Sequence, residues 1–272
     1  MIRVGMSTSC AYPLKTEDGF RLASEVGFDG IEIMVTNEKL SRDPEALLAL
    51  SEKYNMPILS IHAPVLLLTM FVWGRDPYVK LDRAAELAKQ VGAGTVVVHP
   101  PFRWQGSYAR EFERLVREIS QKREIEIAVE NMFPWRVRGR DGKAYLPGID
   151  PSEMDVDAAT LDFSHCALSG RDSLELAKDL GDRLRHIHLT DGVGAEGGNT
   201  MFDEHLPPGH GNEPVAEVLE MLAANNFTGD VVAEVSTRPA KNDRDRIRLL
   251  QETLDFAREH LGQAAPGSHS HS

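Results

Sequence analysis

Short apolar runs rich in β-branched residues alternate with longer segments of helical period along most of this chain. Such alternation is the pattern of repeated strand–helix units, which assemble into a parallel sheet covered by helices. Eight units can close on themselves, so we predict an α/β fold that is a single (β/α)8 barrel with parallel strands and outer helices. The predicted strands are 2–7, 30–35, 58–63, 95–100, 125–131, 159–165, 184–191 and 229–236.

The segments between these runs carry helix end signals. In DPEALLALSEKYN, Asp43 is suited to the N-cap and Pro44 to the first helical position, and YVKLDRAAELAKQVG ends at Gly92, a suitable C-cap. An amphipathic helix over 242–260 closes the fold. Residues 131–158 show no helical period, so most of that segment is expected to be loop.

Length and composition favour one domain. The 272 residues carry a net charge of -12, and no composition shift divides them, so we predict a barrel domain over 1–262 and a disordered tail over 263–272. The acidic balance opposes unassisted attraction to nucleic acid or anionic membrane and favours a small-molecule substrate. With Cys10 and Cys166 as the only cysteines and no secretory leader pattern, we expect a cytoplasmic protein.

The most apolar window covers 58–74. It is shorter than 18 residues and contains His62 and Pro64, so it does not predict a membrane span. Its apolar part, 65–73, is expected to cover the barrel mouth or to form a subunit contact, because soluble monomers avoid exposing such a patch. A homo-oligomer is therefore an open alternative.

Polar, ionisable residues stand near the carboxyl end of six consecutive predicted strands, on the face where barrel active sites form. One such residue would be read as a hydrogen-bonded structural group. Several converging on one mouth, with three carboxylates among histidines, predict bound cations, because isolated buried charges are costly. Mixed imidazole and carboxylate ligands suit Zn²⁺ or Mn²⁺. The candidate ligands are His62, His99, Glu130, Asp162, His165, His188 and Glu234.

The loop FDEHLPPGHG, 202–211, adds two candidates. Asp203 and His205 are two apart and project to the same side of an extended segment, so both can bind one ion. The alternative is a Pro/Gly turn with solvated polar side chains, and His210 is the weaker candidate. In HIHLTD, spacing alone does not choose between His186 and His188, which share a face.

Together these motifs resemble the xylose isomerase-like TIM barrel superfamily, which includes sugar phosphate isomerases and epimerases and the AP endonuclease family 2. The resemblance covers the chain to about residue 260. Each motif alone is weakly specific, and the ordered set is specific. The motifs are HAP (62–64), VVVHP (96–100), AVEN (128–131), LDFSH (161–165), HIHLTD (186–191), DEHLPPGHGN (203–212) and AEVS (233–236).

The resemblance implies a ligand set of one to three ions and selects His188 over His186. The mononuclear isomerase/epimerase site, often holding Mn²⁺, looks like Glu130, Asp162, His188 and Glu234. The trinuclear zinc site of the endonuclease branch looks like those four residues with His62 and His99 on a second ion and His165, Asp203 and His205 on a third.

The chain departs from the endonuclease pattern, which has HxxY after the first histidine, where Val65 stands here. The apolar residues that follow offer few groups to a DNA groove. Arginines in two loops could instead bind the phosphate of a phosphorylated substrate, because guanidinium groups match phosphate oxygens. A solvated charged loop is the alternative. These residues are Arg103, Arg136, Arg138 and Arg140.

Three functions compete. The favoured one is a divalent-metal-dependent sugar or sugar-phosphate isomerase or epimerase, in which Glu130 and Glu234 pass a proton through an enediolate beside the metal-chelated carbonyl. The alternative is a multinuclear zinc phosphodiesterase, with nucleic acid as a partner only in that case. A structural metal protein fits less well, because structural zinc sites are closed and four-coordinate whereas these residues surround an open mouth.

Overall fold

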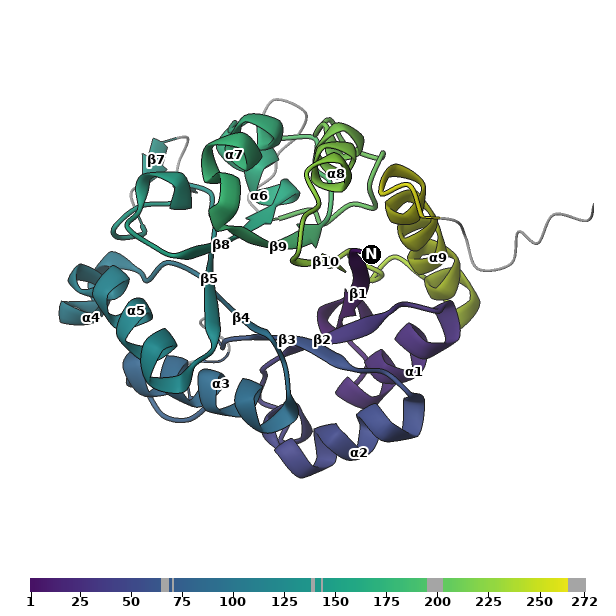
Figure 1. Cartoon of the computed structure of the whole chain (residues 1–272), viewed down its shortest axis with the longest axis horizontal. Coiled ribbons are helices and arrows are strands. Elements are labelled where there is room, and N and C mark those ends of the chain that lie inside the picture. Colours follow the sequence, from purple (N-terminus) through teal and green to yellow (C-terminus); the bar gives the residue numbers. More distant parts are fainter. Residues whose placement is uncertain (65–68, 70, 138–139, 143, 195–202, 264–272) are drawn as a thin grey trace, which may run out of the picture.

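Eight parallel strands form a closed barrel in the computed structural model, which describes residues 1–64, 69, 71–137, 140–142, 144–194 and 203–263. The barrel order is β1-β10-β9-β8-β5-β4-β3-β2, and Figure 1 shows the ring of strands with helices around it. The predicted (β/α)8 fold and its eight strands are confirmed. The strands are β1 (Arg3–Ser7), β2 (Gly30–Met34), β3 (Ile58–His62), β4 (Thr95–Val98), β5 (Glu126–Glu130), β8 (Ala158–Asp162), β9 (Leu184–Leu189) and β10 (Asp230–Ala233).

The helices lie outside the barrel, and two of them have the predicted end signals. The Asp43 carboxylate accepts a hydrogen bond from Ala46 N at 3.2 Å, and Gly92 ends α3 with a φ of 74°. The helices are α1 (Thr16–Val26), α2 (Pro44–Tyr54), α3 (Pro77–Val91), α4 (Ser107–Arg110), α5 (Phe112–Arg123), α6 (Phe163–Ser169), α7 (Ser173–Leu180), α8 (Val215–Ala224) and α9 (Asp243–His260). Short 3-10 helices cover η1 (Thr8–Ala11), η2 (Leu40–Arg42), η4 (Arg103–Gln105), η5 (Pro151–Glu153) and η6 (Gly181–Arg183).

Two segments differ from the sequence expectation. The sixth strand ends at Asp162, and residues 163–165 begin α6 instead of extending the strand. The cause is local: Asp162 is the N-cap, and its Oδ1 accepts the backbone N–H of His165 at 2.9 Å. Within the expected loop 131–158, β6 (Trp135–Val137) and β7 (Arg140–Gly142) pair in antiparallel orientation.

Strand register brings the carboxyl ends of β5, β8, β9 and β10 to one rim of the barrel. Asp162 pairs with His188, and Val232 pairs with the same histidine from the other side. Each of the eight strands contributes apolar residues to one core cluster with the inward faces of the helices. Packing of this core holds the strand ends in place at the rim, where the polar residues lie.

Parts of two expectations lie outside the described residues. The tail 264–272 is one, and residues 65–68 and 70 of the apolar segment are another; of the rest of that segment, Val72 is buried and Phe71 is 65% exposed. Coverage of the mouth therefore stays a prediction. Over the described part of the chain, no helix is both long and apolar enough to cross a membrane.

Candidate metal centre

Four side chains converge at the rim formed by β5, β8, β9 and β10. Glu130 and Asp162 end their strands, His188 is the penultimate residue of β9, and Glu234 directly follows β10. These strands are consecutive neighbours in the barrel. One ligand atom of each residue lies within 4.8 Å of those of the other three. From His188 Nδ1 the distances are 3.0 Å to Glu130 Oε1, 2.9 Å to Glu234 Oε2 and 3.8 Å to Asp162 Oδ2.

The three carboxylates of this cluster are nearly inaccessible to solvent, and none is more than 5% exposed. Burial raises the pKa of Glu130, but the charges of His188 and His99 outweigh burial and hold that pKa well below its usual range. At Asp162 burial prevails over the charges of nearby histidines, and the pKa is raised. Buried carboxylates of this kind need positive charge nearby, from the histidines or from a bound cation.

These residues fit a divalent cation. Asp162 Oδ2 is buried without a hydrogen-bond partner among the described residues, which is costly unless another ligand satisfies it. Three carboxylates and one imidazole, all pointing to one position, form the mixed oxygen and nitrogen donor set that Mn²⁺ and Zn²⁺ accept. Residue spacing alone did not choose between His186 and His188. Of these two histidines, only His188 has a ring nitrogen among the ligand atoms of this group.

Two further predicted histidines lie close to the other carboxylate oxygen of Glu130. His62 ends β3 and His99 directly follows β4, and their Nε2 atoms lie 3.4 and 2.9 Å from Glu130 Oε2. The two rings meet edge to face with centroids 5.1 Å apart, and His62 stacks on His188 at 5.6 Å. The predicted second pair of ligands is thus assembled around the carboxylate that it would share with the first group.

The third predicted group surrounds the carboxylate of Asp203. His165 Nε2 lies 2.8 Å from Asp203 Oδ2, and His205 Nε2 contacts the same oxygen. His165 Nδ1 is 3.3 Å from Glu130 Oε1, so this group adjoins the first. Burial lowers the pKa of His165, but the charges of Asp162 and Asp203 outweigh burial and raise the pKa to about 10. All nine predicted ligands are therefore brought together.

The loop that carries Asp203 and His205 is folded around the buried carboxylate of Asp191. Its Oδ2 accepts the backbone N–H groups of Gly209 and Gly211, both at 2.9 Å, and its Oδ1 accepts that of Glu213 at 3.2 Å. A Cβ at Gly211 would lie 2.2 Å from Asp191 Oδ1, and Gly209 has a φ of 82°. The paired glycines thus allow the loop to wrap a carboxylate, which explains the GHG sequence.

Other predicted residues lie outside this cluster. His210 is half exposed, and its Nε2 lies 2.6 Å from Glu252 Oε1 on α9, as expected for the weaker candidate. Arg103 is exposed in η4. Arg138 lies outside the described residues, and the side chains of Arg136 and Arg140 are not described. Phosphate binding by these arginines stays a prediction.

Sequence reasoning missed Glu32 in the middle of β2. It is fully buried, and its carboxylate contacts His186, His188 and Ser60. Burial raises the pKa of Glu32, but the charge of His188 and the hydrogen bond from His186 outweigh burial and hold that pKa well below its usual range. The available signal was a lone acidic residue in the apolar run GIEIMV, together with a second histidine two residues before His188.

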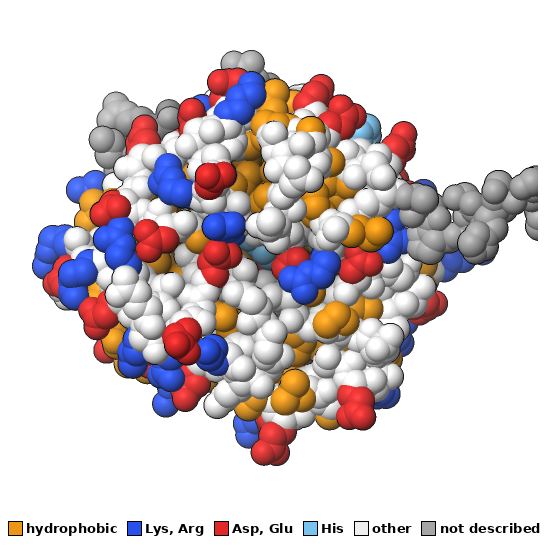
Figure 2. All heavy atoms as spheres, in the orientation of Figure 1, with side chains coloured by type: hydrophobic (Ala, Val, Ile, Leu, Met, Phe, Trp, Pro, Cys, Tyr) orange, Lys and Arg blue, Asp and Glu red, His pale blue; other side chains and the backbone are white. Residues whose placement is uncertain are grey.

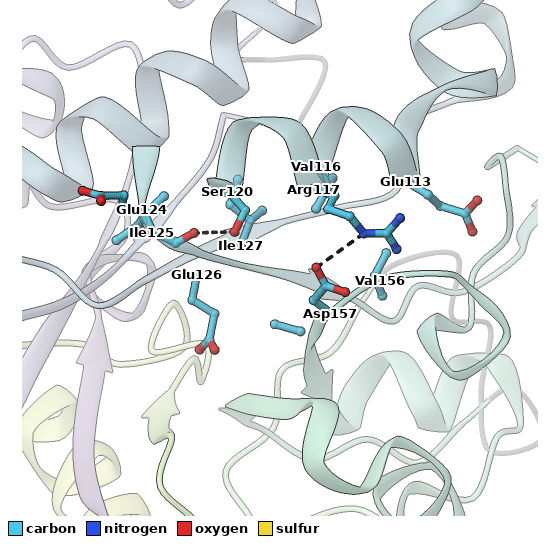
Figure 3. A pocket seen from close by; sticks show the side chains of 11 residues that line it. Glu113, Val116, Arg117, Ser120, Glu124, Ile125, Glu126, Ile127, Val156 and Asp157 are labelled. Atoms are coloured by element: carbon cyan, nitrogen blue, oxygen red, sulfur yellow. Dashed lines mark hydrogen bonds and ion pairs between the residues drawn. The ribbon is translucent and has the colours of Figure 1, made fainter. Parts of the chain in front are cut away.

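A cavity of about 270 Å³ lies at the other end of the barrel. Figure 3 shows it beside α5, where β5 and β8 begin, with Arg117 pointing to Asp157. That guanidinium is already paired, with Asp155 at 2.7 Å and Asp157 at 3.5 Å. None of the predicted site residues lines this cavity. On the face shown in Figure 2, acidic and basic side chains are interspersed.

The fold and the site define a (β/α)8 barrel with histidines and carboxylates gathered at the carboxyl ends of its strands, in groups that could hold a metal ion. The family model described as xylose isomerase-like TIM barrel matches residues 20–260. The chain belongs to that family, as the sequence motifs predicted.

Similar proteins align with nearly the whole chain. The uncharacterized protein Rv0498 of Mycobacterium tuberculosis is 45% identical, with 96% of this chain and 98% of that protein covered. Fructoselysine 3-epimerase of Escherichia coli O157:H7 is 24% identical, with 87% and 91% covered. A solved structure, a D-tagatose 3-epimerase-like protein, superposes with a TM-score of 0.68 at 27% identity and covers 95% of this chain and 99% of its own. The family thus includes sugar epimerases.

Proposed function

We propose that this protein is a divalent-metal-dependent sugar epimerase or isomerase. The observation that carries the proposal is the group formed by Glu130, Asp162, His188 and Glu234, whose ligand atoms lie within 4.8 Å of one another on four adjacent strands. The epimerase names of two relatives, one acting on fructoselysine and one D-tagatose 3-epimerase-like, support the same chemistry. We propose Mn²⁺ or Zn²⁺ as the ion.

The two glutamates supply the acid and base. When bound, the ion polarises a sugar carbonyl and its neighbouring hydroxyl and so acidifies the adjacent C–H bond. Glu130 Oε1 and Glu234 Oε2 both lie close to His188 Nδ1, at 3.0 and 2.9 Å. One ionised carboxylate would remove the C–H proton to give an enediolate, and the other, protonated beforehand from solvent, would return a proton to carbon. Return on the opposite face inverts that carbon.

The surrounding barrel favours this proton transfer. Glu130 and Glu234 are at most 5% exposed, so water competes poorly for the proton once a sugar fills the mouth. The pKa of Glu234 is held below its usual value, because the charge of His188 outweighs the effect of burial. This lowering favours the ionised form, so either glutamate can serve as the base, and the one that serves as the acid must first take up a proton from solvent.

The test is deuterium exchange at carbon. Free and phosphorylated ketoses, beginning with D-tagatose and D-fructose, are incubated with the protein and Mn²⁺ in D2O, and products are identified by NMR. We expect deuterium next to the carbonyl and an epimeric or isomeric sugar. Glu130→Gln and Glu234→Gln should each lower the rate by about 10²- to 10⁴-fold. Glu126→Gln, at the opposite end of β5, is the matched control and should leave the rate unchanged.

A panel of ketoses that all remain free of deuterium, with the metal-loaded protein folded, would refute the proposal. Phosphorylated and free sugars are compared at equal concentration, because the arginine loops predict a preference for phosphate that the described residues do not test. Equal rates for free and phosphorylated sugars would show that Arg103 and its loop do not bind the phosphate.

A zinc phosphodiesterase is the second candidate, and the assembly of the second and third ligand groups favours it. His62 and His99 flank Glu130, and His165 and His205 share Asp203. The assay is hydrolysis of bis(p-nitrophenyl) phosphate and of DNA with an abasic site, in Zn²⁺. Asp203→Asn combined with His205→Ala separates the candidates, because an epimerase keeps much of its turnover and a multinuclear phosphodiesterase loses nearly all.

A further inference from the structure

We propose that Glu32 is a positioning residue for the metal site: it holds the Nε2–H of His188 and so presents His188 Nδ1, as the lone-pair atom, to an ion bound with Glu130, Asp162 and Glu234. This inference rests on the proposed function and deepens it. Glu32 itself would touch neither the ion nor the sugar. It acts through the histidine, from beneath the site in the interior of the barrel.

The buried carboxylate of Glu32 requires a partner that donates a hydrogen bond or carries positive charge. It lies in the middle of β2 and is 0% exposed, and a buried carboxylate without compensation costs several kcal/mol. Its two oxygens lie 3.3 and 3.4 Å from His188 Nε2. The barrel interior therefore keeps a charged acceptor directly behind the proposed metal ligand.

The two ring nitrogens of His188 face different surroundings. Nδ1 points to the proposed ion position, 3.0 Å from Glu130 and 2.9 Å from Glu234, whereas Nε2 points to Glu32. A neutral imidazole has one N–H and one lone pair. With the N–H on Nε2, a hydrogen bond to Glu32 leaves the lone pair on Nδ1, which is the tautomer that a metal ion at this position requires.

Two donors fix the orientation of the Glu32 carboxylate. His186 Nε2 lies 3.0 Å from Oε2, and Ser60 Oγ donates to the same oxygen at 2.8 Å. Oε1 has no hydrogen bond of its own among the described residues, and His188 Nε2 is 3.3 Å away. His186 and His188 share a face of β9 because they are two residues apart. The paired histidines of HIHLTD thus have different roles, one orienting the carboxylate and the other oriented by it.

The expected effect follows from the loss of this support. Carboxylates that accept the second N–H of a metal-bound histidine raise its basicity and fix its ring, and their removal weakens metal affinity by about 10- to 100-fold. Glu32→Gln retains the shape of the side chain and removes the charge. Glu126→Gln is the control, because that glutamate is partly buried at the far end of β5 and pairs with Arg185 at 3.3 Å.

The experiment measures zinc binding and the state of the histidine. Isothermal titration with Zn²⁺ alone gives Kd for wild type, E32Q and E126Q, and ¹⁵N-histidine NMR of the zinc-loaded wild type identifies the metal-bound nitrogen of His188. We expect zinc on Nδ1, a proton on Nε2 shifted downfield by the carboxylate, and a Kd that rises about 10- to 100-fold in E32Q only. In E32Q the Nε2 proton should move upfield.

Zinc on Nε2 of His188 in the wild type would overturn the proposal, even if E32Q failed to fold. An E32Q protein with wild-type Kd and an unshifted Nε2 proton would overturn the positioning role and leave the metal site intact. A folded wild-type protein that binds neither Zn²⁺ nor Mn²⁺ would instead refute the proposed metal site, and this inference with it.

Discussion

Asp191→Asn should open the loop that carries Asp203 and His205. Each carboxylate oxygen of Asp191 accepts two backbone N–H groups, Gly192 and Glu213 on Oδ1 and Gly209 and Gly211 on Oδ2. Asparagine has one acceptor oxygen, so its amide NH₂ would face two of these donors. Each buried N–H that loses its acceptor costs about 1–3 kcal/mol, so the closed loop is destabilised by about 2–6 kcal/mol.

Because the loop lies at the barrel mouth, it can open locally instead of unfolding the domain. We therefore expect amide hydrogen exchange at Gly209 and Gly211 to accelerate at least about 30-fold, which corresponds to about 2 kcal/mol. Asp43→Asn is the control, because an exposed N-cap accepts asparagine as well as aspartate. Exchange at both glycines within a factor of about two of wild type would show that the carboxylate does not hold the loop.

Three other predictions follow from the loop and its surroundings. Gly211→Ala should lower the unfolding temperature more than Gly209→Ala, since a Cβ at 211 would lie 2.2 Å from a buried carboxylate oxygen; equal shifts would argue against the close approach. Burial raises the pKa of Glu213 to about 7, so the unfolding free energy contributed by this group should fall as pH rises from about 4.3 through 7. Glu213→Gln should remove that dependence, so urea unfolding should show the variant gaining stability relative to wild type between pH 5 and pH 8. An unchanged difference in unfolding free energy between the two proteins at these pH values would contradict the reasoning. His205→Ala should reduce bound zinc and His210→Ala should not, as measured by elemental analysis; identical losses would contradict the assignment.

The barrel was predictable because its determinants are local. Runs such as TVVV and IEIAVE combine β-branched residues with a length that suits a buried strand, and Asp43 and Gly92 mark helix ends through their own backbone preferences. Polar residues at strand ends then predicted which side chains would meet, because parallel strands of a barrel bring their carboxyl ends to one rim. Glu130 and His188 are such residues.

The remaining features depend on contacts between distant segments. The sequence predicted His165 on a strand end, whereas a side-chain cap from Asp162 starts a helix there. Glu32 was missed because its partners lie 28 to 156 residues away in the chain, and strand periodicity carries no information on which strands become neighbours across the interior. The hydrogen bonds from the loop to Asp191 were missed for the same reason, although the paired glycines of the loop indicated a tight turn.

The proposed function depends on the binding of a divalent ion by Glu130, Asp162, His188 and Glu234. The most direct measurement is anomalous diffraction at the manganese edge from crystals grown with Mn²⁺. We expect an anomalous peak between these four residues, with His188 bound through Nδ1, and loss of that peak in Glu234→Ala. A fully loaded crystal with no peak at this position, or with manganese bound only between His165 and His205, would contradict it.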